Sequence, residues 1–375
     1  MPDVAALAGV SKSLVSLVMR DEPGAGAETR RRVLDAAARL GYQPDSRARL
    51  LRSGRSRLLG VVFGIQHPFH GDLVTDLYTA AGEAGYELAL SAVTPHRDEE
   101  SAVTGLLQDR CEALIVLGPQ SSAARLTRLA ERLPVVAVAR GVRSAAVGVV
   151  RNADADGLRL AVDHLAGRGH RRIAHIDGGR APGAADRRRG YREAMHRHGL
   201  DAEIRIIPGG LTEEDGAAAA RAMLGLPPAA GTASTTGIAP ATEAAAAASP
   251  TGIAPATEAA AAASTTGIAP ATEAATAASP TGRPTAVTVF NDRCATGVLD
   301  VLARAGVRVP EDVSVVGYDD SRLARLAHVD LTTIAQDTAA MACLAVDQAV
   351  ARVEGRPVAA RECIVPPRLV IRGTG

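Results

Sequence analysis

A short row of polar side chains near the N-terminus has the types and spacing to bind DNA. Gly9 permits a tight turn after a first short helix, and Ser11 is a good N-cap for a second helix. Hydroxyl and ammonium groups at the start of that helix can reach base edges and phosphates in a major groove. These groups belong to Ser11, Lys12, Ser13 and Ser16. We therefore predict a helix-turn-helix whose second helix contacts DNA.

Apolar residues at helical spacing predict the helices that hold this row in place. The third helix begins at Thr29 and ends at Gly41, with Pro44 just beyond it, which is a normal helix stop. The sequence thus predicts an all-α domain over residues 1–44. Its expected inward faces are Val4, Leu7 and Ala8 in the first helix, Val15 and Val18 in the second, and Val33, Leu34, Ala37 and Leu40 in the third.

Charge is distributed unevenly along the 375 residues. The whole chain carries 42 Lys+Arg and 41 Asp+Glu, whereas residues 1–58 hold 11 and 6 of them. A basic head on a slightly acidic body indicates a polyanionic partner at the head. Residues 45–57 are rich in arginine and poor in apolar residues, so alone they cannot bury enough surface to stay folded.

From Leu58 onward, apolar strands alternate with helices. This alternation is typical of parallel sheets covered on both faces, and the strands are too many for one ordinary sheet. We expect two doubly wound lobes that bind a ligand between them, at the carboxyl ends of the strands. The predicted strands are 59–63, 88–91, 113–117, 135–139, 147–150, 173–177, 204–207, 286–290 and 313–318, and the predicted helices include 73–84, 157–166, 190–198, 217–224, 296–305 and 339–353.

One stretch does not fit this alternation. Gly237, Gly252 and Gly267 are spaced by 15 residues, and each lies in a copy of Thr-Gly-Ile-Ala-Pro-Ala-Thr-Glu followed by an alanine-rich run. Each copy offers one isoleucine, and its proline interrupts any helix. We interpret residues 229–282 as a low-complexity insertion that is mostly disordered, and favour a recent repeat expansion over a dedicated binding segment.

Other kinds of chemistry have little support. There is no Gly-rich phosphate fingerprint after a strand and no nucleophile elbow, so we expect no enzyme activity, no catalytic residue and no cofactor. No run of about 18 apolar residues predicts a membrane span, and no secretory signal is recognisable, so we expect a cytoplasmic protein. No two cysteines have the spacing of metal ligands or a redox pair, which predicts no metal site; they are Cys111, Cys294, Cys343 and Cys363.

The N-terminal segment closely resembles the start of lactose-repressor (LacI/GalR) family proteins. The resemblance implies a transcriptional repressor, a homodimer on a palindromic operator, and a periplasmic-binding-protein-like sensor of two lobes for a small, sugar-like effector. It also implies a hinge helix over residues 45–52 that folds on DNA, with Leu51 as a minor-groove wedge. Arg47, Ala48, Arg49, Leu51 and Arg52 are its implied DNA contacts. The matching motifs are Asp3-Val4-Ala5-Ala6-Leu7-Ala8-Gly9-Val10-Ser11, Leu40-Gly41-Tyr42-Gln43-Pro44 and Ala48-Arg49-Leu50-Leu51-Arg52-Ser53-Gly54-Arg55.

The sensor resembles the family over nearly all of residues 58–375. By that resemblance Phe69, Arg187 and Asp292 contact the effector, and His67 lies in the same loop as Phe69. An arginine fork and a carboxylate suit hydroxyl-rich or amide-bearing ligands. Asp292 could instead cap the helix that follows it. The matching motifs include Leu59-Gly60-Val61-Val62, Pro68-Phe69, Gly169-His170-Arg171-Arg172-Ile173-Ala174, Gly190-Tyr191-Arg192, Asn291-Asp292 and Val315-Val316-Gly317-Tyr318-Asp319-Asp320.

Three departures from the family pattern bear on function. Leu17 stands where the family commonly has an arginine that reads guanine; leucine can touch a thymine methyl but cannot donate to a base, which predicts an atypical operator. Leu211 stands where relatives often place an aromatic residue, so stacking on a sugar is weak. The polar segment that usually precedes the first helix is missing, and we expect the true start to lie several codons upstream.

These observations predict three parts. A helix-turn-helix domain covers 1–44, a hinge 45–57, and an effector-binding and dimerisation domain 58–375. Within the last, lobe one spans about 58–151 and 337–365, and lobe two about 152–336 and 366–375. The alternative is a solute-binding protein of a transport system, which would use the two-lobed half alone.

Overall fold

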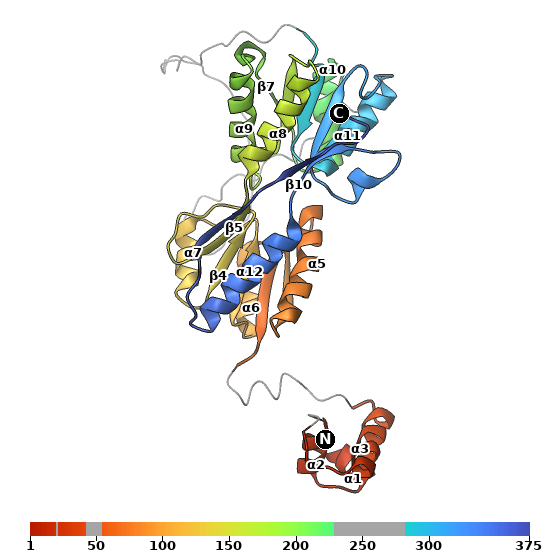
Figure 1. Cartoon of the computed structure of the whole chain (residues 1–375), viewed down its shortest axis with the longest axis vertical. Coiled ribbons are helices and arrows are strands. Elements are labelled where there is room, and N and C mark those ends of the chain that lie inside the picture. Colours follow the sequence, from red (N-terminus) through yellow and green to blue (C-terminus); the bar gives the residue numbers. More distant parts are fainter. Residues whose placement is uncertain (20–21, 43–54, 229–281) are drawn as a thin grey trace, which may run out of the picture.

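The computed structural model describes residues 1–19, 22–42, 55–228 and 282–375. These residues form a small helical domain and two α/β lobes (Figure 1), which confirms the expected fold class. The predicted hinge helix over 45–52 lies outside the described residues. So does the predicted insertion, apart from its last residue, Gly282.

The helical domain is a helix-turn-helix supported by a third helix. Its helices are α1 (Pro2–Ala8), α2 (Lys12–Met19) and α3 (Ala27–Arg39). Gly9 ends α1 in the left-handed conformation, with φ 63°, and α2 leaves at 97° to α1. The Ser11 hydroxyl accepts a hydrogen bond from the Leu14 amide at 3.2 Å, so Ser11 caps α2 as predicted.

The core of this domain is narrower than the sequence predicted. Val4, Val15 and Val33 are buried where the three helices meet, with small alanines around them. Leu7, Leu34 and Leu40 were expected inside but are 44%, 48% and 47% exposed. Because alanines occupy the inward positions of α1 and α3, the helices pack closely and these leucines lie beside the seam.

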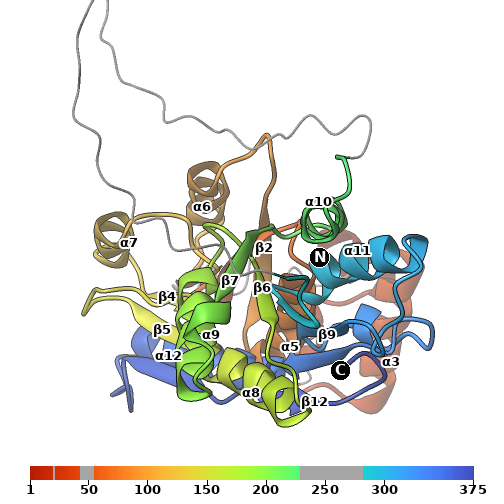
Figure 2. The same ribbon diagram turned by 90° about the horizontal axis from the view of Figure 1, so that it is seen from above.

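Lobe one is a parallel six-stranded sheet in the order β11-β5-β4-β3-β1-β2. Helices α5 and α12 pack on one face and α6 and α7 on the other (Figures 1 and 2). The strand order reverses beside β1, where a crevice opens at the carboxyl ends. The elements are β1 (Leu58–Gly64), α5 (Pro68–Glu83), β2 (Glu87–Val93), α6 (Glu99–Gln108), β3 (Ala113–Leu117), α7 (Ala123–Ala130), β4 (Val135–Val138), β5 (Gly148–Asn152), α12 (Thr338–Val353) and β11 (Glu362–Val365).

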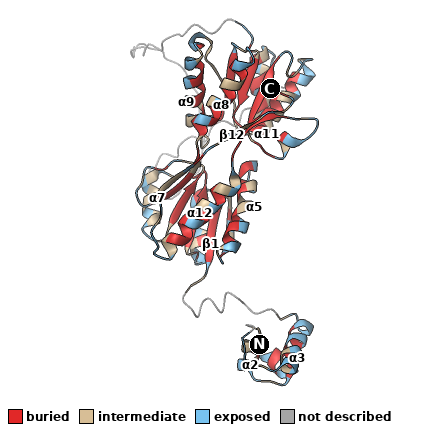
Figure 3. Cartoon of the chain, viewed as in Figure 1, coloured by how far each residue is buried: buried red, intermediate tan, exposed pale blue. Residues whose placement is uncertain are grey.

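Lobe two repeats this plan with the order β12-β10-β9-β8-β6-β7, in which only the β10–β12 pair is antiparallel. Both sheets are buried beneath helices whose outer faces are exposed (Figure 3). The elements are α8 (Asp154–Gly167), β6 (Ile173–Asp177), α9 (Ala184–Arg197), β7 (Arg205–Pro208), α10 (Glu213–Leu224), β8 (Ala286–Val289), α11 (Asp292–Arg304), β9 (Ser314–Asp319), β10 (Thr332–Ala335) and β12 (Arg368–Val370), with short 3-10 turns η1 (Asp201–Glu203) and η2 (Leu323–Arg325).

The chain crosses between the lobes three times, from β5 to α8, from β10 to α12 and from β11 to β12 (Figure 1). All nine predicted strands are present within a residue or two of their expected bounds. Strands β10, β11 and β12 were not predicted, because they are short and two of them are edge strands that carry exposed polar residues such as Arg368.

No single helix among the described residues is long and apolar enough to cross a membrane. Helices α1 and α2 reach that threshold only when joined end to end, and the 97° bend between them is the turn of the helix-turn-helix.

Candidate functional site

The predicted DNA-binding side chains lie along α2. Ser11, Lys12 and Ser13 are exposed, and Ser16 and Leu17 are half-buried. The opposite side of α2 is held against α1 and α3 by Val15 and Val18, which are buried. The polar side chains of α2 therefore lie on one face of the helix, which is open to contact a DNA groove. The remaining predicted contacts, Arg47, Ala48, Arg49, Leu51 and Arg52, lie outside the described residues.

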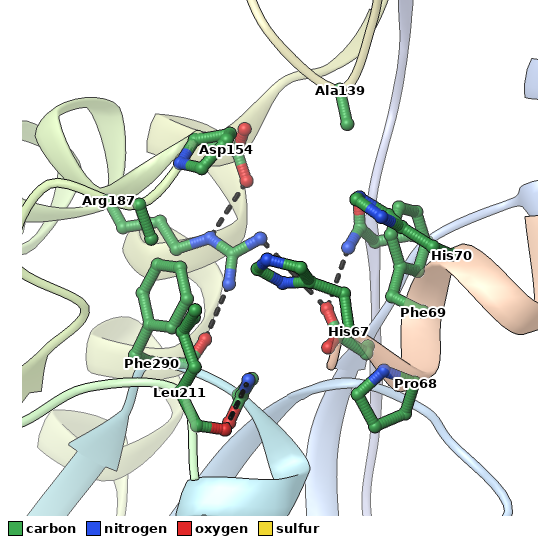
Figure 4. A pocket seen from close by; sticks show the side chains of 14 residues that line it. His67, Pro68, Phe69, His70, Ala139, Asp154, Arg187, Leu211 and Phe290 are labelled. Carbon is green, nitrogen blue, oxygen red and sulfur yellow. Dashed lines mark hydrogen bonds and ion pairs between the residues drawn. The ribbon is translucent and has the colours of Figure 1, made fainter. Parts of the chain in front are cut away.

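A pocket lies between the two lobes, near the connecting strands (Figure 4). It encloses about 490 Å³ including its solvent-open mouth, a size typical of small-molecule sites. Lobe one contributes His67 with the first residues of α5, and Ala139 just after β4, whereas lobe two contributes the ends of several strands and helices. The lining residues are His67, Pro68, Phe69, His70, Ala139, Asp154, Ala181, Pro182, Arg187, Leu211, Phe290, Asn291, Asp319 and Gln336.

Arg187, on α9, is the buried centre of this pocket. Its Nε donates to Asp154 Oδ1 at 2.9 Å, and its guanidinium lies 3.5 Å from the centre of the Tyr318 ring and 4.5 Å from that of Phe290. A further N–H donates to the Phe290 carbonyl, and Nη2 is 3.9 Å from Asp319 Oδ1. Burial alone would lower the pKa of Arg187, but Asp154 and its other neighbours raise it. The arginine fork expected to grip a ligand is therefore largely occupied by the protein.

Two carboxylates stand beside this arginine. Burial raises the pKa of Asp154, and the adjacent Arg187 opposes that shift. Burial raises the pKa of Asp319 to about 8, again opposed by Arg187. Gln336 Nε2 donates to Asp319 Oδ1 at 2.7 Å. The pocket therefore offers hydrogen-bonding acceptors around a charge that is already paired, which suits neutral hydroxyl groups better than an anion.

The two histidines of the lobe-one wall are neutral. His70 is buried, its Nδ1 accepts from the Gly64 amide at 3.1 Å, and burial lowers its pKa to about 3. Burial, and next the charge of Arg293, lower the pKa of His67. The two rings lie 4.6 Å apart. Because Nδ1 of His70 accepts, its Nε2 carries the proton and can donate.

The structure does not place Asp292 in the pocket. It is 1% exposed, and its two carboxylate oxygens accept from Thr333 Oγ1 at 2.6 Å and from the Ser321 amide at 2.7 Å. It is not the helix cap either, because Asn291 caps α11 by accepting from the Cys294 amide at 2.7 Å. The residue that lines the pocket is Asn291, one position earlier.

Of the five effector-binding residues expected from the sequence, four line the pocket, namely His67, Phe69, Arg187 and Leu211. The fifth, Asp292, does not. The prediction missed Asp154, Asn291, Asp319 and Gln336. Asp319 could have been predicted from the sequence, because it directly follows a predicted strand and ligands bind at the carboxyl ends of such strands. Gln336 could not, since it follows β10, which was not predicted.

Three family matches cover most of the chain. Residues 1–45 match bacterial regulatory proteins of the lacI family. Residues 56–251 match the periplasmic binding proteins and sugar binding domain of the LacI family, and residues 242–374 match a periplasmic binding protein-like domain.

Known proteins resemble the whole chain. The HTH-type transcriptional regulator GalR of Escherichia coli K12 is 28% identical over 99% of this chain and 94% of its own. A LacI transcriptional regulator structure from Rhodococcus is 44% identical over 84% of this chain and 97% of that one, with a TM-score of 0.68. The structure of the lac repressor dimer bound to operator and the anti-inducer ONPF is 25% identical and covers 99% of this chain and 97% of its own, with a TM-score of 0.72. The structure of a complex of the transcriptional regulator CelR with cellobiose is 25% identical and covers 100% of this chain and 98% of its own, with a TM-score of 0.64.

Proposed function

The chain belongs to the LacI family of bacterial transcriptional regulators, and from that premise we propose that it is a repressor whose affinity for its operator is set by a carbohydrate bound between its two lobes. The observation that carries this proposal is the combination of an exposed polar face on α2 with an acceptor-rich interlobe pocket in one chain. A transport receptor would use the pocket but has no use for a DNA-binding domain.

The carbohydrate is assigned from the chemistry of the pocket and from the family. Asp154, Asp319 and Gln336 present acceptors and an amide to hydroxyl groups, and Phe69 and Phe290 present apolar surface. The family domain is described as sugar binding, and one similar structure holds cellobiose. Because Arg187 is already paired with Asp154, we favour a neutral sugar over a phosphorylated one.

The proposed coupling runs through lobe one. Sugar binding closes the lobes and changes the position of lobe one, whose β1 begins just after the linker from the DNA-binding domain. We assign residues 1–44 to DNA binding, 45–57 to the hinge and 58–375 to effector binding and dimerisation. In the hinge, Leu51 would wedge into the minor groove while Arg47, Arg49 and Arg52 neutralise phosphates. We propose that the protein acts as a homodimer, as the similar lac repressor does in its operator complex. We also propose that it works in the cytoplasm, where its operator DNA lies.

Footprinting on the region upstream of its own gene tests this proposal. We expect a protected palindrome whose affinity falls steeply with salt, and a change in protection with one of D-galactose, D-ribose, maltose or cellobiose. Absence of a protected site would reject the regulator. A protected site that no sugar affects would reject the carbohydrate effector while keeping the regulator.

A further inference from the structure

One arginine bridges the mouth of the pocket. Arg293, in the first turn of α11 in lobe two, donates from Nη1 to the Gln66 carbonyl of lobe one at 3.1 Å. Its Nε donates to Glu213 Oε2 at 2.5 Å, which fixes the direction of the guanidinium. The Arg293 side chain is 27% exposed and that of Glu213 is 42% exposed, so water can still reach the bridge.

Among the described residues, this is the one hydrogen bond between the lobes that lies away from the strands connecting them. The charges of Arg322 and Arg325 in lobe two also act on Asp72 of lobe one. Within the described ranges, the other interlobe hydrogen bonds lie at the connecting strands, such as Asn152 Nδ2 to the Tyr318 hydroxyl at 3.0 Å and the Ala153 amide to the Val365 carbonyl at 3.0 Å. Those bonds lie where the chain passes from one lobe to the other. The Arg293–Gln66 bond joins the two lobes away from those strands, so an opening of the lobes would break it.

The bridge also joins three segments that line the pocket. Gln66 precedes His67, Glu213 follows Leu211 by two residues, and Arg293 follows Asn291 by two. Asn291 Nδ2 donates to the Leu211 carbonyl at 3.2 Å, so the two lobe-two segments move together. A change in the bridge is therefore transmitted to pocket residues on both lobes.

We propose that Arg293 is a positioning residue that clasps the two lobes at the pocket mouth and slows the escape of the effector. The inference rests on the proposed function, because it concerns retention of the same sugar. A charged donor makes a stronger hydrogen bond to a carbonyl than a neutral donor does, and Glu213 holds the guanidinium in position for it. The clasp acts on the closed state only, so it favours closure without contacting the sugar.

The test compares full-length Arg293→Met, Arg293→Lys, Glu213→Gln and the double variant Arg293→Met/Glu213→Gln with the wild type. Arg304→Met is the matched control, because it removes an arginine from the same helix whose partner is Asp300, at 2.9 Å, within that helix. The probe is whichever of D-galactose, D-ribose, maltose and cellobiose binds the wild type most tightly. We measure its dissociation rate, the melting temperature, and hydrogen exchange of the amides of residues 64–70 without sugar.

We expect Arg293→Met to release the sugar about three- to tenfold faster and to raise exchange in residues 64–70, with an unchanged melting temperature. Arg293→Lys should restore part of the difference, and Glu213→Gln should have no further effect once Arg293 is methionine. Arg304→Met should resemble the wild type.

Unchanged dissociation in Arg293→Met overturns the proposal, whether or not exchange rises. A lower melting temperature that Arg293→Lys does not restore also overturns it, in favour of a purely structural role. If no sugar binds the wild type, the carbohydrate effector fails by itself, and in that case unchanged hydrogen exchange of residues 64–70 in Arg293→Met overturns the clasp.

Discussion

The DNA-binding face and the interlobe pocket are built in opposite ways. The first consists of neighbouring residues at and just after the start of α2, namely Ser11, Lys12, Ser13, Ser16 and Leu17, all of them at least partly exposed. The second collects side chains from segments that range from His67 to Gln336, and the side chains of its charged members are at most 11% exposed. A site on one helix needs only local periodicity, whereas a site between lobes needs the strand order of both sheets.

The two sites also differ in what their polar groups do for stability. Lys12 projects from α2 and makes no ion pair within the described residues, so its loss should affect binding alone. Arg187 pairs with Asp154 at 2.9 Å, where both side chains are 6% exposed, and Asp319 lies 3.9 Å from the same guanidinium. Their loss should affect folding as well as binding, and the predictions below test this contrast.

Arg187→Ala should have the largest effect. It leaves Asp154, which is 5% exposed, without its partner, and an uncompensated buried charge costs about 3–5 kcal/mol. Urea denaturation followed by circular dichroism measures the loss in the free energy of unfolding. Arg304→Ala, whose side chain is 77% exposed, should cost little. Equal effects of the two substitutions would remove the contrast between the sites.

The pH dependence of stability should depend on Asp319. Burial raises its pKa from 3.8 to about 8 in the folded protein. Between these values the folded state holds a proton that the unfolded state has released, so the free energy of unfolding should fall as pH rises from about 4 to about 8. Asp319→Asn cannot titrate but keeps an acceptor for Gln336, so it should flatten this decline, whose slope for one proton is about 1.4 kcal/mol per pH unit. Parallel curves for both proteins would show that the Asp319 carboxyl titrates normally.

Lys12→Ala should weaken operator binding by about 1–3 kcal/mol if the ammonium contacts a base. Sugar affinity and melting temperature should stay at their wild-type values, because the side chain is exposed and does not line the pocket. Titration of labelled operator at two salt concentrations, with calorimetry for the sugar, separates these quantities. If Lys12→Ala kept the wild-type operator affinity, the N-terminal end of α2 would not be the part that recognises the operator.

Deleting residues 229–281 should have the smallest effect. The repeats contain few large apolar residues, and a change in loop length costs little entropy, so we expect the free energy of unfolding to change by less than about 1 kcal/mol. Operator affinity and its response to sugar should also be retained. A large fall in melting temperature would show that this segment is part of the folded sensor.

Much of the fold could be predicted from periodicity. Apolar runs located nine of the twelve strands, and the Gly9–Ser11 turn located the helix-turn-helix. Exposed polar edge strands such as β12 escaped because their sequence carries no apolar run. In the pocket, Phe69 and Arg187 were placed by resemblance to the family, but the occupation of the Arg187 fork by Asp154 and the Phe290 carbonyl could not be foreseen.

The sequence by itself determined the DNA-binding face, the alternation of strands and helices, and the chain's membership of its class, because each depends on residues within a few turns of one another. Only the tertiary structure decided which polar group faces the effector. Asn291 and Asp292 are neighbours, yet one lines the pocket and the other is buried against Thr333 and Ser321. The reason is that a helix begins between them, and successive side chains on a helix diverge by about 100°. Their surroundings come from β9 and β10, strands distant in sequence that only the sheet order brings to this edge.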